Sequence, residues 1–322
     1  GDLSPVEQDR AIAPSPAGRR KVVLATSIAE TSLTIEGVRI VIDGGLMRVP
    51  RFSPRSGMTR LETVRVSQAS ADQRRGRAGR LEPGVCYRLW TEETQRGLLP
   101  FTPPEILDAD LAPLALELAA WGVADAASLP WLTPPPSASL ATARALLADL
   151  GAIDQAGAIT AHGRAMARLG QHSRLAHLVL KGRDMGQGRV AALLVAILGE
   201  RDFLRLPPGQ RDADLRHRVD IALSGKRDGT LRLIQEAARR LTQNQASRET
   251  PDISMTGALL ALAYPDRIGR RRAGTAGRYL LSGGRGAALP EGDPMGNEEF
   301  LVVAETDGST QDSRIFLAAP TT

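Results

Sequence analysis

The pattern of hydrophobic and polar positions predicts an α/β domain in the first third of the chain. Short β-branched runs at 20–27 (RKVVLATS) and 38–45 (VRIVIDGG) predict buried parallel strands. The turn-rich residues 46–70 predict an extended β arm followed by a strand, and GVCYRLW at 84–90 predicts a further strand. We therefore expect an α/β fold with a parallel sheet over residues 1–103.

Beyond residue 103 the hydrophobic positions follow helical spacing. The runs at 104–122 and 139–154 predict helices, and the run at 154–167 predicts a small β wing that follows a helix. This combination indicates a compact winged helix over 104–166.

The remaining residues predict two further modules. Residues 167–263 contain Ala- and Leu-rich helical segments, which predict an all-helical module. Residues 264–322 return to short strands separated by glycine turns, as in a small, partial β barrel similar to the OB fold.

Positive charge is concentrated near the start of the chain. The 322 residues carry a net charge of +5, but residues 10–80 alone hold 14 Arg or Lys against 5 Asp or Glu. Such a local excess favours phosphate-rich partners, and nucleic acid in particular. Aromatic residues make up only 3% of the chain, so contacts to the backbone of a nucleic acid should outweigh base stacking.

Several function classes are disfavoured by the composition. Cys86 is the single cysteine, and the four histidines lack metal-ligand spacing with it, so we expect neither a disulfide framework nor a metal site. The longest apolar run is far shorter than the roughly 20 residues of a membrane span, and the first residues lack an apolar signal segment. We expect a cytoplasmic protein without a membrane partner.

The stretch QRRGRAGR (73–80) is the strongest candidate for chemistry. If a helix opens at Asp72 or Gln73, Arg77 and Arg80 lie on one face, with Gln73 one turn before Arg77. Donors that converge in this way suit a phosphoryl group, whose oxygens carry the charge during transfer. A solvated basic helix or a general nucleic-acid patch is the alternative for an isolated arginine-rich octamer.

A second stretch, ATSIAETSLTIEGV (25–38), gives this octamer a context. Together the two stretches resemble motifs V and VI of superfamily 2 helicases of the DExH/DEAH type, where AT-x-IAETSLTI-x-GV and QR-x-GR-x-GR are the usual forms. The resemblance continues through 84–93 and 104–122 and extends over nearly the whole chain. It is strongest over residues 3–120.

The resemblance implies a nucleotide site for ATP. It assigns Gln73, Arg77 and Arg80 to the γ-phosphate, with Gln73 orienting the attacking water and the two arginines acting as arginine fingers. Thr34 and Glu36 would lie on the nucleotide side of the motif V loop. The family often has Asp at position 36, so Glu36 departs from its pattern.

The resemblance also implies contacts to single-stranded RNA or another nucleic acid. Thr26 and Ser27 would touch the RNA backbone, although the family often has Asn at position 27. Arg48, in the β arm, matches a basic residue that grips the strand.

The family's domain order assigns the four predicted parts. It implies a second RecA-like domain (1–103), a winged helix (104–166), a helical ratchet module of the HA2 type (167–263) and an OB-like barrel (264–322). The sequence contains neither a G-x-x-x-x-G-K-[ST] phosphate loop nor a D-E-x-H motif. We therefore expect a fragment that cannot hydrolyse ATP unaided, with Mg²⁺ held mainly by the first RecA-like domain of the same protein.

Two other classes of function stay open from the residues alone. The basic surface is also compatible with a non-catalytic nucleic-acid-binding module or adaptor. The helical half is compatible with a scaffold that recruits partners.

Overall fold

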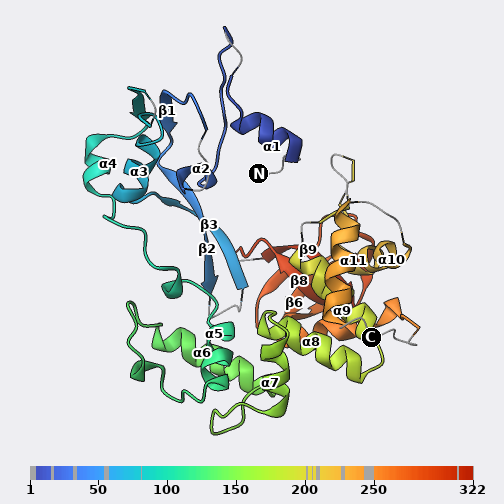
Figure 1. Cartoon of the computed structure of the whole chain (residues 1–322). Coiled ribbons are helices and arrows are strands. Elements are labelled where there is room, and N and C mark those ends of the chain that lie inside the picture. Colours follow the sequence, from blue (N-terminus) through green and yellow to red (C-terminus); the bar gives the residue numbers. More distant parts are fainter. Residues whose placement is uncertain are drawn as a thin grey trace. The chain divides into compact units, whose positions relative to one another are not determined.

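A computed structural model describes residues 5–15, 18–31, 35–53, 58–80, 82–200, 202–204, 206–207, 211–225, 229–242, 250–309 and 312–321. The chain divides into two compact units (Figure 1). The first contains Gly1–Arg51 and Arg60–Ala109, and the second contains Phe52–Thr59 and Asp110–Thr322. The candidate site lies in the first unit.

The first unit contains a short parallel sheet. Strand β1 (Ile40–Asp43) pairs with β4 (Val85–Arg88) in parallel, which confirms two of the predicted strands. A second sheet joins β2 (Leu46–Ser53) to β3 (Met58–Arg65), in agreement with the predicted β arm and the strand after it. The other elements are α1 (Pro5–Ile12), α2 (Ile28–Thr31), α3 (Gln68–Arg75), α4 (Glu92–Arg96) and the 3₁₀ turn η1 (Glu105–Leu107).

One predicted strand is wrong. Residues 19–26 have no regular secondary structure, and the side chains of Val22 and Leu24 are 87% and 95% exposed. A β-branched run becomes a strand only where a neighbouring strand satisfies its backbone groups, and no described strand pairs with this run. The predicted burial of β1 is also wrong, because Ile40 and Ile42 are 62% and 68% exposed.

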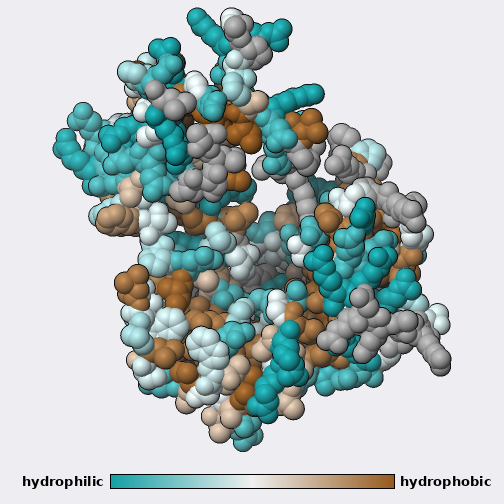
Figure 2. Space-filling view, viewed as in Figure 1, coloured by the Kyte–Doolittle hydropathy of each residue, from teal (hydrophilic) through white to brown (hydrophobic). Residues whose placement is uncertain are grey.

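The second unit begins with helices, as predicted. They are α5 (Ala112–Ala120), η2 (Ala126–Ser128), α6 (Ser137–Asp149), α7 (Ala161–Arg168), α8 (Ser173–Asp184), α9 (Gly188–Gly199), α10 (Leu215–Leu223), α11 (Gly229–Leu241), η3 (Ile253–Met255) and α12 (Thr256–Ala263). Between α6 and α7, where a β wing was predicted, Ile153 and Ile159 form an isolated antiparallel bridge. Helix α11 buries Leu231 and Ile234 on one face and shows a hydrophilic surface on the other (Figure 2). No helix in the described ranges reaches the length and apolarity needed to cross a membrane.

The last part of the chain is a five-stranded barrel. Its elements are η4 (Pro265–Arg267), β5 (Ile268–Arg271), β6 (Arg278–Leu281), β7 (Gly286–Ala288), η5 (Pro294–Asn297), β8 (Phe300–Thr306) and β9 (Asp312–Pro320). The strand order is β5-β6-β7-β9-β8, and pairing of β8 with β5 closes the ring. The barrel was predicted to be partial, but it is closed, because β9 pairs with both β7 and β8.

The helices and the barrel share one hydrophobic core. Leu194 and Leu215 of the helices pack in the same cluster as Val302 and Leu317 of the barrel. A backbone hydrogen bond of 2.8 Å from the amide of Ala318 to the carbonyl of Ala213 also ties β9 to the segment before α10. The barrel therefore completes the core of the helical part.

Two histidines form a buried polar pair in the second unit. Nε2 of His162 lies 2.9 Å from Nδ1 of His177, and His177 is only 7% exposed. Burial, followed by the charges of His162 and Lys181, lowers the pKa of His177 to about 4. Burial also lowers the pKa of His162.

This pair should make the second unit sensitive to acid. Between pH 6.5 and 4 the unfolded state binds a proton at position 177 that the folded state does not, so stability falls as the pH falls. We expect a loss of about 2 kcal/mol between pH 7 and pH 5, measured by urea unfolding, and a smaller loss in His177→Gln. The exposed His217, whose pKa is raised by the hydrogen bond that its ring donates to Asp212, is the control. An equal relief of the acid loss by His217→Gln would contradict the assignment to His177.

Candidate nucleotide and nucleic-acid site

Helix α3 leads into the arginine-rich stretch. Its N-cap is Ser67, whose hydroxyl accepts a hydrogen bond of 3.1 Å from the amide of Ser70. The helix was expected to open at Asp72 or Gln73, and this expectation is wrong because the cap at Ser67 starts the helix earlier. The helix has ended before the last two arginines of the stretch.

Those two arginines lie in a turn rather than along a helical face. The amide of Arg77 donates to the carbonyl of Arg74 (3.1 Å), and the amide of Ala78 donates to that of Arg75 (3.0 Å). The tight turn bends the chain directly after α3. Arg77 and Arg80 are nevertheless brought to the same place, since both line one pocket with Arg74.

The backbone of Gly84 packs closely against this turn. A Cβ atom at Gly84 would lie 1.9 Å from the carbonyl oxygen of Ala78 and 2.7 Å from that of Arg39. The amide of the next residue, Val85, donates to the same carbonyl of Arg39 (2.8 Å). Only glycine fits between the arginine turn and the start of β1.

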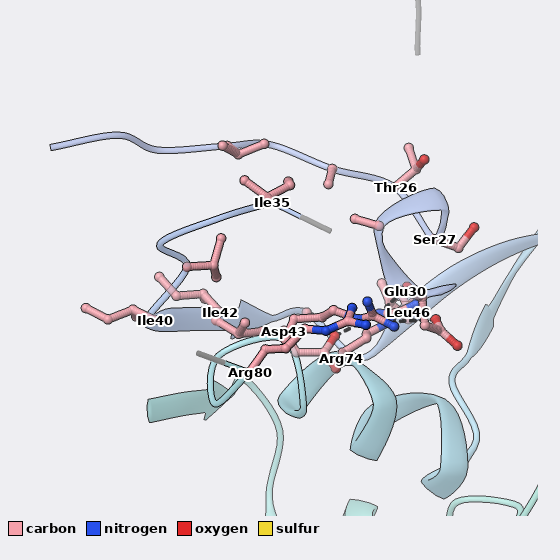
Figure 3. A pocket seen from close by; sticks show the side chains of 17 residues that line it. Thr26, Ser27, Glu30, Ile35, Ile40, Ile42, Asp43, Leu46, Arg74 and Arg80 are labelled. Atoms are coloured by element: carbon pink, nitrogen blue, oxygen red, sulfur yellow. Dashed lines mark hydrogen bonds and ion pairs between the residues drawn. The ribbon is translucent and has the colours of Figure 1, made fainter. Parts of the chain in front are cut away.

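The pocket has a volume of about 310 Å³ and two chemically distinct sides (Figure 3). Ile35, Ile40 and Ile42 supply hydrocarbon surface at one end. Thr26 and Ser27 supply hydroxyl groups at the other end, and the arginines supply charged groups in a separate part of the lining. Such a mixed lining suits a ligand, or a neighbouring domain, that presents both charged and apolar groups.

Arg77 is the group that is poised for a ligand. Its Nη1 is buried and has no hydrogen-bond partner within the described part of the chain. A buried guanidinium N–H without an acceptor is costly, and such groups are found where a ligand supplies the acceptor. An anion in the pocket would satisfy it.

Arg74 differs, because its charge is satisfied internally. Its Nε donates to Glu30 Oε2 (3.1 Å), and its Nη1 donates to Asp43 Oδ1 (2.8 Å) and to the carbonyl of Leu46 (3.2 Å). Burial opposes the charged form, but the hydrogen bonds and charges of Asp43 and Glu30 outweigh it and raise the pKa of Arg74. The charge of Arg74 is therefore balanced within the first unit, whereas Nη1 of Arg77 has no acceptor among the described residues.

The predicted nucleic-acid residues of motif V lie at the start of α2. Thr26 and Ser27 are exposed, and their carbonyls accept hydrogen bonds from the amides of Ala29 (3.2 Å) and Glu30 (2.9 Å). In Figure 3 they lie away from Arg74 and Arg80. The hydroxyl groups and the arginines thus occupy different parts of one pocket.

Three other predicted residues lie outside the pocket lining. Gln73 is exposed on α3, and Glu36 is exposed in the turn before β1. Arg48 is exposed on β2. Thr34 falls outside the described residues. The structure therefore brings together Arg77, Arg80, Thr26 and Ser27, but not Gln73, Glu36 or Arg48.

Sequence reasoning missed two carboxylates. Asp43 is 3% exposed, and its Oδ1 accepts hydrogen bonds from Arg74 and from the amide of Gly45. The second is Glu30, whose carboxylate accepts the hydrogen bond from Nε of Arg74. Asp43 did carry a signal, because an acid at the carboxyl end of a hydrophobic strand in an α/β sheet stands where ligands bind.

Metal ligands do not gather in the part of the chain that the structure describes. No group of three or more His, Cys, Asp or Glu side chains there could hold a metal ion. His172 instead pairs with Asp110 (3.0 Å), and His217 pairs with Asp212 (2.7 Å).

Comparisons with known proteins agree with this geometry. Residues 1–82 match the family model for the helicase conserved C-terminal domain. The chain is 43% identical, over 320 residues, to the ATP-dependent RNA helicase HrpB of Escherichia coli, covering 99% of this chain and 38% of that protein. It is 40% identical over 222 residues to the E. coli ATP-dependent RNA helicase HrpA, covering 67% of this chain and 17% of HrpA.

Solved structures of HrpB are also similar to this chain. A crystal structure of the E. coli DEAH/RHA helicase HrpB matches with a TM-score of 0.87 and 39% identity, covering 100% of this chain and 39% of that one. A second, of the E. coli DExH-box NTPase HrpB, matches with a TM-score of 0.83, 42% identity, 100% of this chain and 38% of that one. The chain is thus a helicase carboxyl-terminal region, similar to that of the DEAH/RHA helicase HrpB. The similarity to HrpB extends along nearly the entire chain, which spans about two fifths of that relative.

Proposed function

We propose that this chain is the carboxyl-terminal side of an ATP-dependent RNA helicase. The whole protein would couple ATP hydrolysis to movement along single-stranded nucleic acid and to displacement of duplex. The observation that carries the proposal is the buried Nη1 of Arg77, which has no hydrogen-bond partner among the described residues and lies in a pocket that Arg80 and motif V also line. The E. coli relatives named above are ATP-dependent RNA helicases, which supports this assignment.

On the nucleotide side, Arg77 and Arg80 would bind the terminal phosphate of ATP. A guanidinium presents several N–H donors in a plane, which suits the equatorial oxygens that carry the charge during phosphoryl transfer. Gln73, exposed beside the turn on α3, would orient the attacking water. Thr34 and Glu36 would contact the nucleotide from the motif V loop.

The phosphate-binding loop and the Mg²⁺ ligands would come from a first RecA-like domain of the same protein. Mg²⁺ neutralises phosphate charge when it is bound. We infer that the chain alone does not hydrolyse ATP and that its arginines act only once the first domain presents the nucleotide.

On the nucleic-acid side, Thr26, Ser27 and Arg48 would contact the RNA backbone. Hydroxyl and guanidinium donors to phosphates position a strand without reading its sequence. The excess of basic residues over 10–80 supports this mode. RNA affinity should therefore depend steeply on salt and little on sequence.

The finer architecture belongs to the same proposal. We infer a winged helix over 104–166, an HA2-type ratchet over 167–263 that closes over the strand, and an OB-like barrel over 264–322. The helical order and the five-stranded barrel support this division. A cytoplasmic location, where RNA and ATP are both present, fits the proposal.

The test is RNA-dependent ATP hydrolysis by the full-length protein. We expect single-stranded RNA to stimulate hydrolysis, and ATP with Mg²⁺ to drive displacement of a duplex that has a single-stranded tail. The logarithm of RNA affinity should fall linearly with the logarithm of salt concentration, by roughly 0.7 per neutralised phosphate. RNA binding without hydrolysis in the full-length protein would overturn the helicase and leave a nucleic-acid-binding module.

A further inference from the structure

Arg74 occupies the point where three elements of the first unit meet. Its side chain is 16% exposed, and its acceptors lie on α2 (Glu30), at the end of β1 (Asp43) and at the start of β2 (Leu46). The side chains of Glu30 and Asp43 are 14% and 1% exposed. Such well-shielded charge-assisted bonds hold their partners more firmly than surface ion pairs do.

A continuous path runs through Arg74 from motif V to the arginine turn. The carbonyl of Ser27 accepts from the amide of Glu30 (2.9 Å), and the carboxylate of Glu30 accepts from Nε of Arg74 (3.1 Å). The carbonyl of Arg74 then accepts from the amide of Arg77 (3.1 Å). Each step of the path is a hydrogen bond. The side chain of Arg74 links α2 to α3.

We propose that Arg74 is a positioning residue that couples the nucleic-acid side of the pocket to its nucleotide side. Because it joins α2 to α3, a displacement of Arg77 on loss of the terminal phosphate is transmitted to Glu30 and then to Ser27. Nε and Nη1 of Arg74 are occupied within the protein, so these two groups hold α2 and β1 to α3 rather than a ligand. The inference rests on the proposed function, because it assigns the two ends of the path to ATP and RNA.

The guanidinium shape is essential to this role. Nε and Nη1 of Arg74 reach two carboxylates on different elements at once. A lysine ammonium is a single point on a flexible stem and does not reproduce this planar fork. Retention of charge alone should therefore not preserve the coupling.

The coupling is measured as the ratio of RNA affinities with and without a non-hydrolysable ATP analogue, in the full-length protein. Coupling factors between two sites are typically about 5- to 150-fold. We expect this ratio to fall to about one in Arg74→Gln and Arg74→Lys. Arg75→Gln is the matched control, because Arg75 is 63% exposed, forms a 3.6 Å surface pair with Asp72 and is not among the residues that line the pocket. It should keep the wild-type ratio.

Glu30→Ala provides a second variant that leaves the bond between Arg74 and Asp43 in place. We expect it to lower the ratio as Arg74→Gln does, and the double variant Glu30→Ala/Arg74→Gln to show no further loss. A wild-type ratio in folded Arg74→Gln or in Glu30→Ala would overturn the inference. Wild-type protein with no nucleotide-dependent change in RNA affinity would instead count against the proposed function, so the two failures are distinguishable.

Discussion

Replacing Arg77 with alanine in the full-length protein is expected to lower RNA-stimulated ATP hydrolysis by about 10³- to 10⁵-fold, the range that an arginine finger contributes to phosphoryl transfer. The expectation follows from the buried Nη1 of Arg77, which lacks a partner among the described residues and can therefore donate a hydrogen bond to a phosphate oxygen. Arg80→Ala should also abolish turnover, since Arg80 lines the same pocket. Hydrolysis is measured at saturating RNA and ATP.

Stability and RNA binding separate a catalytic role from a structural one. Since Nη1 of Arg77 makes no hydrogen bond to the residues that the structure describes, Arg77→Ala should keep the unfolding temperature of the wild type. RNA affinity without nucleotide should also stay nearly intact. Loss of hydrolysis and RNA binding to the same extent would show that Arg77 maintains the fold or binds RNA, and the assignment to the phosphate would fail.

Gly84→Ala is expected to lower ATP hydrolysis by about 100-fold although Gly84 touches no ligand, because a shift of about 1 Å in a catalytic group has an effect of this size. The added methyl group would lie 1.9 Å from the carbonyl of Ala78, between the two arginines of the turn. The turn must move to relieve this contact. Overpacking of this kind should also lower the free energy of unfolding by about 1–3 kcal/mol.

Gly97→Ala is the matched control for this substitution. Its new Cβ would lie 3.6 Å from the carbonyl of Thr94, an ordinary van der Waals contact, and its φ of −83° suits alanine. Hydrolysis by Gly97→Ala should match the wild type. Full activity in Gly84→Ala would mean that the turn tolerates displacement and that Gly84 does not position it.

The arginine turn illustrates what a motif predicts and what it leaves out. The spacing of Arg77 and Arg80 predicted that both would serve one ligand, and the structure brings both to one pocket. The predicted helical face was wrong, because the N-cap at Ser67 starts α3 earlier and the turn follows its end. The pairing of Arg74 with Glu30 and Asp43 depends on contacts between segments far apart in sequence, which residue spacing does not reveal.

The strands also show which features follow from local sequence and which depend on contacts between distant segments. Periodicity predicted β1, β4 and the strands of the barrel, because alternation and β-branching are local properties. It failed for residues 19–26, where strand formation requires a partner that no described segment supplies. Closure of the barrel depends on parallel pairing of β7 with β9, with Ala287 opposite Ser313, and nothing local in either segment specifies it.

The common core of the helices and the barrel has a practical consequence for dissecting the protein. Val302 and Leu317 are buried against helical residues such as Leu194. A recombinant fragment that ended after α12 would therefore expose a hydrophobic surface to water. Such a piece would tend to aggregate, and the excised barrel would do the same. The segment from α8 to β9 is therefore best expressed as one piece, and point substitutions rather than truncations are the appropriate way to assign roles within it.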